Sequence, residues 1–252
     1  MLPSRQRLAA AGFAAGMLLV GRPAAAGASV WVIDDGEKIR RDATETAFER
    51  GEHNPVWQPG GHARVFAMRG ESVALQVVVE AGEAALDEVT VSLPELDGPG
   101  GAALGDSRAA APGGPQRPIE RFVEHFVEVR RPSGGRVAGE SLGWSAGAGP
   151  PRGRWVGPVP DALVPVEASS SWCPYPMHVA AHTNGVVWID LNVPRDARAG
   201  TYRGAIDVRE RGRELAVVAV ELSIADASLP DGPPATVYYD PDELARRVGP
   251  GA

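Results

Sequence analysis

A candidate nucleophile is Ser141, in the stretch Gly-Glu-Ser-Leu-Gly that covers residues 139–143. This is the G-x-S-x-G pattern of serine hydrolases, in which a strained turn between a strand and a helix exposes the serine hydroxyl group. No strand pattern precedes Ser141, no helix pattern follows it, and the surrounding residues are rich in Gly and Pro. We interpret the match as a chance occurrence, so a serine esterase would depend on Ser141 alone.

Two histidines have the spacing of metal ligands. His178 and His182 are four residues apart, which on a helix would place both imidazole rings on one face. The glutamate of H-E-x-x-H is missing, and Pro174 and Pro176 just before them favour an extended chain. The other histidines, His125 among them, are scattered. We expect exposed or locally hydrogen-bonded histidines, and we predict no metal site and no cofactor.

Two acidic clusters offer the paired carboxylates that glycoside hydrolysis requires. One is Asp34 with Asp35, and the other comprises Asp240, Asp242 and Glu243. Neighbours along a strand point to opposite faces, so Asp34 and Asp35 are poorly placed to act as a pair. We expect a turn at the first cluster and, at the second, a helix cap followed by a proline. No catalytic residue is predicted.

Tryptophan and tyrosine residues are frequent in or beside the predicted loops. Flat aromatic faces on loops can stack on sugar rings or anchor a partner domain. Packing in the core or under a loop is the alternative, since large aromatic residues are highly buried on average. The candidate ligand-binding residues are Trp144, Trp155, Trp172 and Tyr175, and Trp57 and Trp188 belong to the same aromatic set.

The elements that must position these residues are strands. Apolar residues recur at every second position over residues 72–80 and again over residues 185–193. This alternation predicts two half-buried strands, with Val77 and Ile189 in the core. Shorter β-rich runs, bounded by Gly, Pro or Asp, occupy residues 30–33, 64–68, 88–93, 201–208 and 215–224.

Two connecting segments are also informative. Residues 210–213, between the last two β-rich runs, predict a hairpin turn. Residues 119–129 fit a helical face as well as a strand face. We predict a strand there because Pro118 and Pro132 bracket the segment closely.

Little else in the chain has regular periodicity. Residues 38–50 are a candidate short helix, and residues 97–118 and 132–160 are rich in Gly and Pro and predict long loops. Several strands without intervening helices favour antiparallel sheets. The predicted fold is all-β, a two-sheet antiparallel β-sandwich (Ig-like) with long Gly/Pro-rich loops.

Composition narrows the function classes. The 252 residues carry a formal net charge of −7, whereas nucleic-acid binding needs a basic surface. We therefore expect no nucleic-acid partner. Cys173 is the single cysteine, so no intramolecular disulfide can form and stability must come from the core.

The N-terminus has the layout of a secretory signal. A basic stretch over residues 1–7 is followed by an uncharged apolar run over residues 8–20 and then by small residues. The apolar run is shorter than the roughly 20 residues that span a bilayer. We expect residues 1–28 to be a signal peptide, cleaved before Gly27 or Ser29. The mature protein would then be extracytoplasmic, periplasmic or secreted, without a membrane anchor.

Five stretches, in this order, carry a family resemblance. The chain resembles the N-terminal part of bacterial secreted proteins with domain of unknown function 4091, which are related to glycoside hydrolase family 123. The stretches are residues 30–39 (Val-Trp-Val-Ile-Asp-Asp-Gly-Glu-Lys-Ile), 54–57 (Asn-Pro-Val-Trp), 73–77 (Val-Ala-Leu-Gln-Val), 140–144 (Glu-Ser-Leu-Gly-Trp) and 199–204 (Ala-Gly-Thr-Tyr-Arg-Gly).

The resemblance implies a division of the chain. In such relatives an N-terminal sandwich precedes a (β/α)8 barrel, and in the hydrolase family the catalytic acidic residues lie in that barrel. Residues 29–230 then correspond to the sandwich, and residues 231–252 resemble the start of a missing barrel. The barrel's catalytic residues have no counterpart in this chain.

Two functions remain open at this point. The resemblance implies a non-catalytic accessory β-sandwich module of a carbohydrate-active, glycoside hydrolase-like secreted protein, with a barrel domain as its partner. The alternative is a stand-alone module whose loop aromatics bind a polysaccharide or a surface partner.

The signal peptide predicts a shortened mature protein. Intact-mass measurement on the extracytoplasmic fraction should give a chain that begins at Gly27 or Ser29, because signal peptidase cuts after small residues. A species in that fraction that still starts at Met1 would contradict the prediction.

Overall fold

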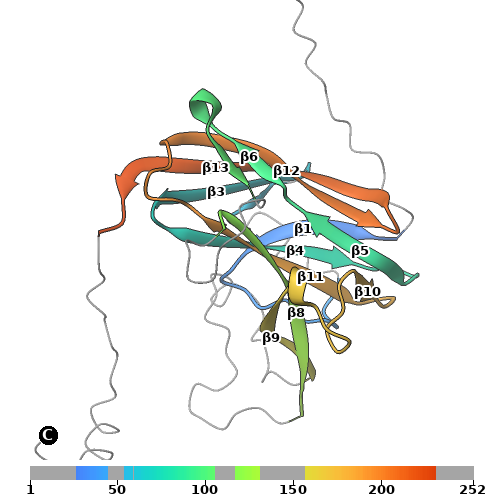
Figure 1. Cartoon of the computed structure of the whole chain (residues 1–252). Helices are drawn as coiled ribbons and strands as arrows, with labels where there is room; N and C mark the ends of the chain where they lie inside the picture. The colour runs from blue at the N-terminus through green and yellow to red at the C-terminus, as the bar shows by residue number, and fades with distance from the viewer. Residues whose placement is uncertain (1–26, 45–53, 59, 106–116, 131–156, 231–252) are drawn as a thin grey trace, which may run out of the picture.

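The computed structural model describes residues 27–44, 54–58, 60–105, 117–130 and 157–230. Strands dominate this part of the chain and form two stacked sheets (Figure 1), which confirms the predicted all-β sandwich. The helical pieces described are two single turns, η1 (Pro99–Gly101) and η2 (Val166–Ala168). No helix in the described part is long and apolar enough to cross a membrane.

The first sheet has five strands in the spatial order β1-β4-β11-β8-β9, and every neighbouring pair is antiparallel. The two strands with the clearest alternation, β4 and β11, therefore lie side by side at its centre. The strands are β1 (Ser29–Asp34), β4 (Ser72–Glu80), β8 (Ile119–Val129), β9 (Gly157–Pro165) and β11 (Asn184–Asn192).

The second sheet has the order β10-β5-β12-β13-β3-β2, with the short strands β6 and β7 attached beside β12. Its pairs are antiparallel except β3 with β13, which is parallel, so this sheet is mixed. The strands are β2 (Trp57–Gln58), β3 (His62–Arg69), β5 (Leu86–Ser92), β6 (Glu95–Asp97), β7 (Ala103–Gly105), β10 (Met177–Val179), β12 (Gly200–Glu210) and β13 (Arg213–Ser228).

All the strands expected from alternation or β-rich composition are present, and residues 119–129 form β8 as predicted. The hairpin between β12 and β13 is confirmed too. Its two loop residues, Arg211 and Gly212, have φ angles of 46° and 74°. Positive φ at both loop positions is the geometry that matches the twist of the flanking strands.

Three expectations were wrong. Residues 38–44 form turns and irregular chain instead of the start of a helix, and residues 45–50 lie outside the described part. The predicted loop over 97–118 contains β7, which pairs with β6 as a hairpin. The predicted loop over 132–160 ends in the first residues of β9. These strands are short or proline-rich, so their sequences carry little β signal.

The main core fills the space between the two sheets. Val77 and Ile189 are both fully buried in it, as predicted, and they lie on the adjacent strands β4 and β11. Val208 and Leu222 contribute from β12 and β13 of the second sheet. Every second residue of each central strand therefore packs into one apolar layer.

The outer face of the first sheet is also buried, which the alternation did not predict. A second apolar cluster lies there, and it explains why Gln76, Val78 and Glu80 of β4 are buried along with their inward-facing neighbours. The cluster consists of Trp31, Ile33, Ile39, Val78, Phe126 and Val186.

Residues 37–44, which include Ile39 of this cluster, are held to the first sheet by two buried amide side chains and by backbone hydrogen bonds that join Arg41 to β11 and β9. Gln76 donates from Nε2 to the carbonyl oxygens of Asp34 and Glu37, both at 2.7 Å. Asn184 donates from Nδ2 to the carbonyl oxygens of Arg40 at 2.9 Å and Ala43 at 2.6 Å. These bonds satisfy backbone acceptors of an irregular segment, which explains polar residues on a buried face.

Truncating the core should destabilise the protein. Val77→Ala and Ile189→Ala should each lower the free energy of unfolding by about 1–4 kcal/mol, because each leaves a cavity between the sheets. Urea denaturation measures this. Glu214→Ala, an exposed change on β13, is the control. Core variants that unfold at the control's midpoint would show that these side chains do not lie between the sheets.

Candidate functional site

A pocket of about 340 Å³ lies where two strands of the first sheet separate. β8 and β11 are paired from Ile119 with Leu191 to Val123 with Val187, where the register ends. Beyond Val123, β8 continues with β9 as its partner, away from the body of the sheet (Figure 1). The resulting fork is lined by side chains from β8, from the start of β11 and from the loop before β10.

Trp172 stands at the tip of the loop before β10. Ser170 and Cys173 exchange two backbone hydrogen bonds, of 3.3 and 3.2 Å, which close a tight turn around Ser171 and Trp172. Cys173 is buried, whereas Trp172 is 61% exposed. The Trp172 ring lies edge-on to that of His125, with ring centroids 4.8 Å apart and planes at 84°. The pocket thus has an exposed, oriented aromatic ring on its wall.

Tyr175 anchors the same loop. Its hydroxyl group donates to the carbonyl oxygen of Val91 and accepts from the Val91 amide, both at 2.9 Å. Ser169 also donates from its hydroxyl group to the carbonyl oxygen of Tyr175 at 3.4 Å. Both hydrogen-bonding capacities of the Tyr175 hydroxyl are used inside the fold, so this residue supports the loop that presents Trp172.

Glu124 is a buried carboxyl group in the wall of the fork. Its cross-strand partner in β9 is Leu163, while its neighbour Val123 pairs with Val164 and packs in the inter-sheet core. Glu124 therefore lies on the outer face. It is 6% exposed, and its Oε2 atom is fully covered without a hydrogen-bond partner in the described part of the chain.

Burial controls the charge of this carboxyl group. Desolvation raises the pKa of Glu124 to about 8, and the positive charge of Lys38 acts in the opposite direction without offsetting it. The Lys38 ammonium group donates to the carbonyl oxygen of Pro160 at 3.2 Å. Glu124 is thus mostly protonated at neutral pH and can both donate and accept a hydrogen bond.

Arg41 completes the charged lining of the pocket. Its guanidinium carbon lies 4.7 Å from the centroid of the Phe126 ring, a cation–π arrangement. Arg41 is part of the segment that covers the outer face of the sheet. The same segment therefore contributes both Lys38 and Arg41 to the surroundings of Glu124.

The histidine pair is not brought together on one helix face. His178 lies on β10, where its Nδ1 atom is 2.6 Å from Asp87 Oδ1. His182 follows in a turn, and its Nε2 atom is 3.5 Å from Glu83. The described residues contain no group of three or more His, Cys, Asp and Glu side chains that could hold a metal ion.

The first acidic cluster forms a turn, as expected. The Gly36 amide donates to Asp34 Oδ1 at 3.2 Å at the end of β1. Of the other aromatic residues, Trp57 lies in β2, and Trp188 lies in β11 and donates from its indole N–H to Asp190 at 2.6 Å. Trp144, Trp155, Ser141, Asp240, Asp242 and Glu243 lie outside the described residues.

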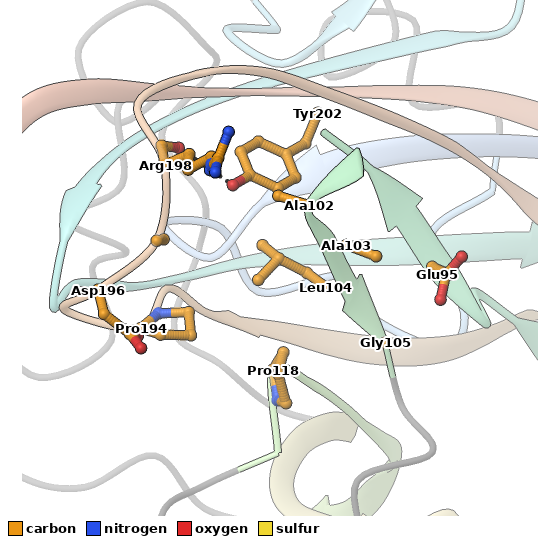
Figure 2. A pocket seen from close by; sticks show the side chains of 11 residues that line it. Glu95, Ala102, Ala103, Leu104, Gly105, Pro118, Pro194, Asp196, Arg198 and Tyr202 are labelled. Atoms are coloured by element: carbon orange, nitrogen blue, oxygen red, sulfur yellow. Dashed lines mark hydrogen bonds between the residues drawn. The ribbon is translucent and has the colours of Figure 1, made fainter. Parts of the chain in front are cut away.

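A second pocket, of about 430 Å³, lies between the β6–β7 hairpin and the loop before β12. Figure 2 shows Leu104 and Pro118 on its walls and Tyr202 beside Arg198. Tyr202 is 1% exposed and donates its hydroxyl hydrogen to the carbonyl oxygen of Arg198 at 3.0 Å. This pocket therefore offers no exposed ring, and the fork is the better candidate site.

Sequence reasoning found Trp172 but missed Glu124, Arg41 and the role of His125. One signal was available, since Glu124 and His125 interrupt the apolar residues of 122–127, in a segment between two prolines. Its burial depends on a covering segment that was expected to be helical, so alternation alone could not reveal it.

Of the solved structures compared with this chain, one with a TM-score above 0.5 supports the fold. A family 123 glycoside hydrolase from Clostridium perfringens is similar to 81% of this chain, with a TM-score of 0.53 and 13% identity. The N-terminal domain of PorA and a putative membrane anchored protein from Corynebacterium diphtheriae, at 10% and 14% identity, both have a TM-score of 0.29. The aligned regions cover 79% and 82% of this chain, and 100% and 37% of those two chains, respectively.

These likenesses have clear limits. The aligned region spans 28% of the length of the family 123 enzyme, so that enzyme contains much more than the part compared. No family model matches the chain, and no curated protein matches it. At 13% identity the likeness shows the sandwich fold and nothing finer.

The raised pKa of Glu124 predicts a pH-dependent stability. Between pH 5 and pH 8 the unfolded chain releases a proton that folded Glu124 keeps, so the free energy of unfolding should fall as pH rises. The fall due to this group should be roughly 3 kcal/mol. Urea midpoints at the two pH values measure it.

Glu124→Gln is the matched control, because the amide keeps the shape of the protonated carboxyl group but does not titrate. The variant should lose less stability between pH 5 and pH 8 than the unmodified protein. Equal losses in the two proteins would show that Glu124 ionises normally in the folded state.

Proposed function

We propose that the chain is a non-catalytic β-sandwich module of a secreted, carbohydrate-active protein and acts beside a glycoside hydrolase-like (β/α)8 barrel. The observation that carries the proposal is the similarity of 81% of the chain to part of a family 123 glycoside hydrolase. The resemblance to proteins with domain of unknown function 4091 and the signal-like N-terminus support it. In this proposal residues 29–230 form the module, and the module acts outside the cytoplasm.

A second candidate function is direct binding of a glycan. One observation favours it: Trp172 is 61% exposed on the wall of a pocket, whereas most large apolar side chains of the described residues are covered. An aromatic ring on a loop can pack against the apolar face of a sugar ring. The hydroxyl groups at the edge of the sugar then stay free to form hydrogen bonds. The two candidates are compatible, since an accessory module can also hold the substrate of its barrel.

The accessory role predicts that the chain has no hydrolytic activity of its own. The purified chain should release no nitrophenol from aryl glycosides or from short acyl esters, because in this proposal catalysis belongs to the barrel. Ser141→Ala is the control, and it should behave like the unmodified chain. Glycoside turnover by the chain alone would contradict the proposal.

A further inference from the structure

The fork pocket combines two features that are costly for an empty site. Trp172 exposes a large apolar ring, and Glu124 keeps a covered carboxyl oxygen without a hydrogen-bond partner among the described residues. A buried polar group without a hydrogen-bond partner destabilises the folded state. Both residues line one pocket of about 340 Å³. A single ligand there can cover the ring and, once the carboxyl group turns toward the pocket, bond to its oxygen.

We propose that this pocket binds one sugar unit of a glycan, which stacks on the Trp172 ring and hydrogen-bonds to the carboxyl group of Glu124. The inference rests on the second candidate function and deepens it. Beyond the exposed tryptophan, it specifies the pocket that binds, the residue that makes the polar contact and the class of ligand. Glu124 becomes the residue that orients the sugar, and Trp172 provides its apolar platform.

The Trp172 platform is oriented before the ligand arrives. The edge-on contact with His125 and the two backbone bonds between Ser170 and Cys173 restrict the ring. Tyr175 fixes the following part of the loop to Val91. A side chain that is already ordered loses little entropy on binding, so the ring can contribute most of its contact energy to the ligand.

The protonated carboxyl group of Glu124 suits hydroxyl groups. It offers one donor and one acceptor, and each sugar hydroxyl group also donates and accepts. The terminal torsion of a glutamate is broad, so the carboxyl group can turn either oxygen toward a ligand in the pocket. Two adjacent hydroxyl groups of a sugar ring can therefore satisfy both roles at once.

The other residues of the site argue against two alternative ligand classes. Arg41 on the pocket wall and Lys38 near Glu124 are positive, which disfavours a cationic ligand beside an uncharged carboxyl group. A purely apolar ligand would leave the Glu124 oxygen without a partner. The volume is at the lower end of the range of ligand pockets, which fits one ring better than an extended chain.

Four variants of the full chain test the proposal on a printed array of plant, bacterial and animal oligosaccharides, followed by calorimetry with the best-bound glycan. Trp172→Ala removes the platform. Glu124→Leu removes the polar contact, because it replaces the carboxyl group with an apolar side chain of similar size. Glu124→Gln keeps one donor and one acceptor. Phe66→Ala is the matched control, since Phe66 is 64% exposed on β3 of the other sheet and lines a separate pocket beside Asp34 and Arg64.

The unmodified chain should bind at least one glycan on the array. Trp172→Ala and Glu124→Leu should each weaken binding about 10-fold or more, which is the size expected for a lost buried contact. Glu124→Gln should stay within about 3-fold of the unmodified chain, and Phe66→Ala should be unchanged. Urea midpoints of all four variants establish that each is folded in the assay.

Three results would overturn the proposal, and each contradicts a different claim. If folded Trp172→Ala and Glu124→Leu bind normally, glycan binding lies elsewhere and only the fork site is wrong. If Glu124→Gln loses binding as completely as Glu124→Leu, the site needs a charged carboxylate, and the role of Glu124 as a protonated donor and acceptor is wrong. If the unmodified chain binds no glycan, direct binding fails as well, while the accessory role keeps its own test.

Discussion

The covering of the outer face of the first sheet is the constraint on which the rest of the structure depends. The central strands of that sheet bear apolar residues on both faces, and one face packs on the second sheet. The other face is covered by an irregular segment, residues 37–44, whose backbone acceptors need partners away from water. Gln76 and Asn184 provide them from within the sheet. Two polar side chains thus allow a segment without regular structure to complete a core.

The candidate site follows from this arrangement. Because the outer face is covered, Glu124 is desolvated and keeps its proton. Because β8 leaves β11 after Val123, the covered face opens into a fork at that point. The loop before β10 closes the fork on its other side and carries Trp172. Neither the aromatic ring nor the carboxyl group is a site by itself, and it is the separation of two strands that places them on one pocket.

The sequence predicts the sandwich well because its signal is local. Alternation over β4 and β11 identifies both strands and predicts that Val77 and Ile189 are buried. Each pattern depends only on the two-residue period of an extended chain. It does not reveal that Gln76 is buried, because that depends on residues 37–44 lying over the strand. Likewise, the parallel pairing of β3 with β13 joins segments far apart in the chain. Of the site, Trp172 could be predicted from its residue type, whereas Glu124 required knowledge of what covers it.

The most direct test is an NMR titration of the Glu124 side-chain carboxyl carbon, assigned by its absence from the spectrum of Glu124→Gln. It reports on the covering segment and on the state of the site at once. A carboxyl group desolvated under the covering segment should have a titration midpoint of about 8. In Asn184→Ala, which removes the side-chain hydrogen bonds to Arg40 and Ala43 and so loosens the covering segment, the midpoint should move down toward the ordinary range of a glutamate. A midpoint near 4.5 in the unmodified chain would show that the outer face is open to water, and the account of both the fold and the site would be wrong.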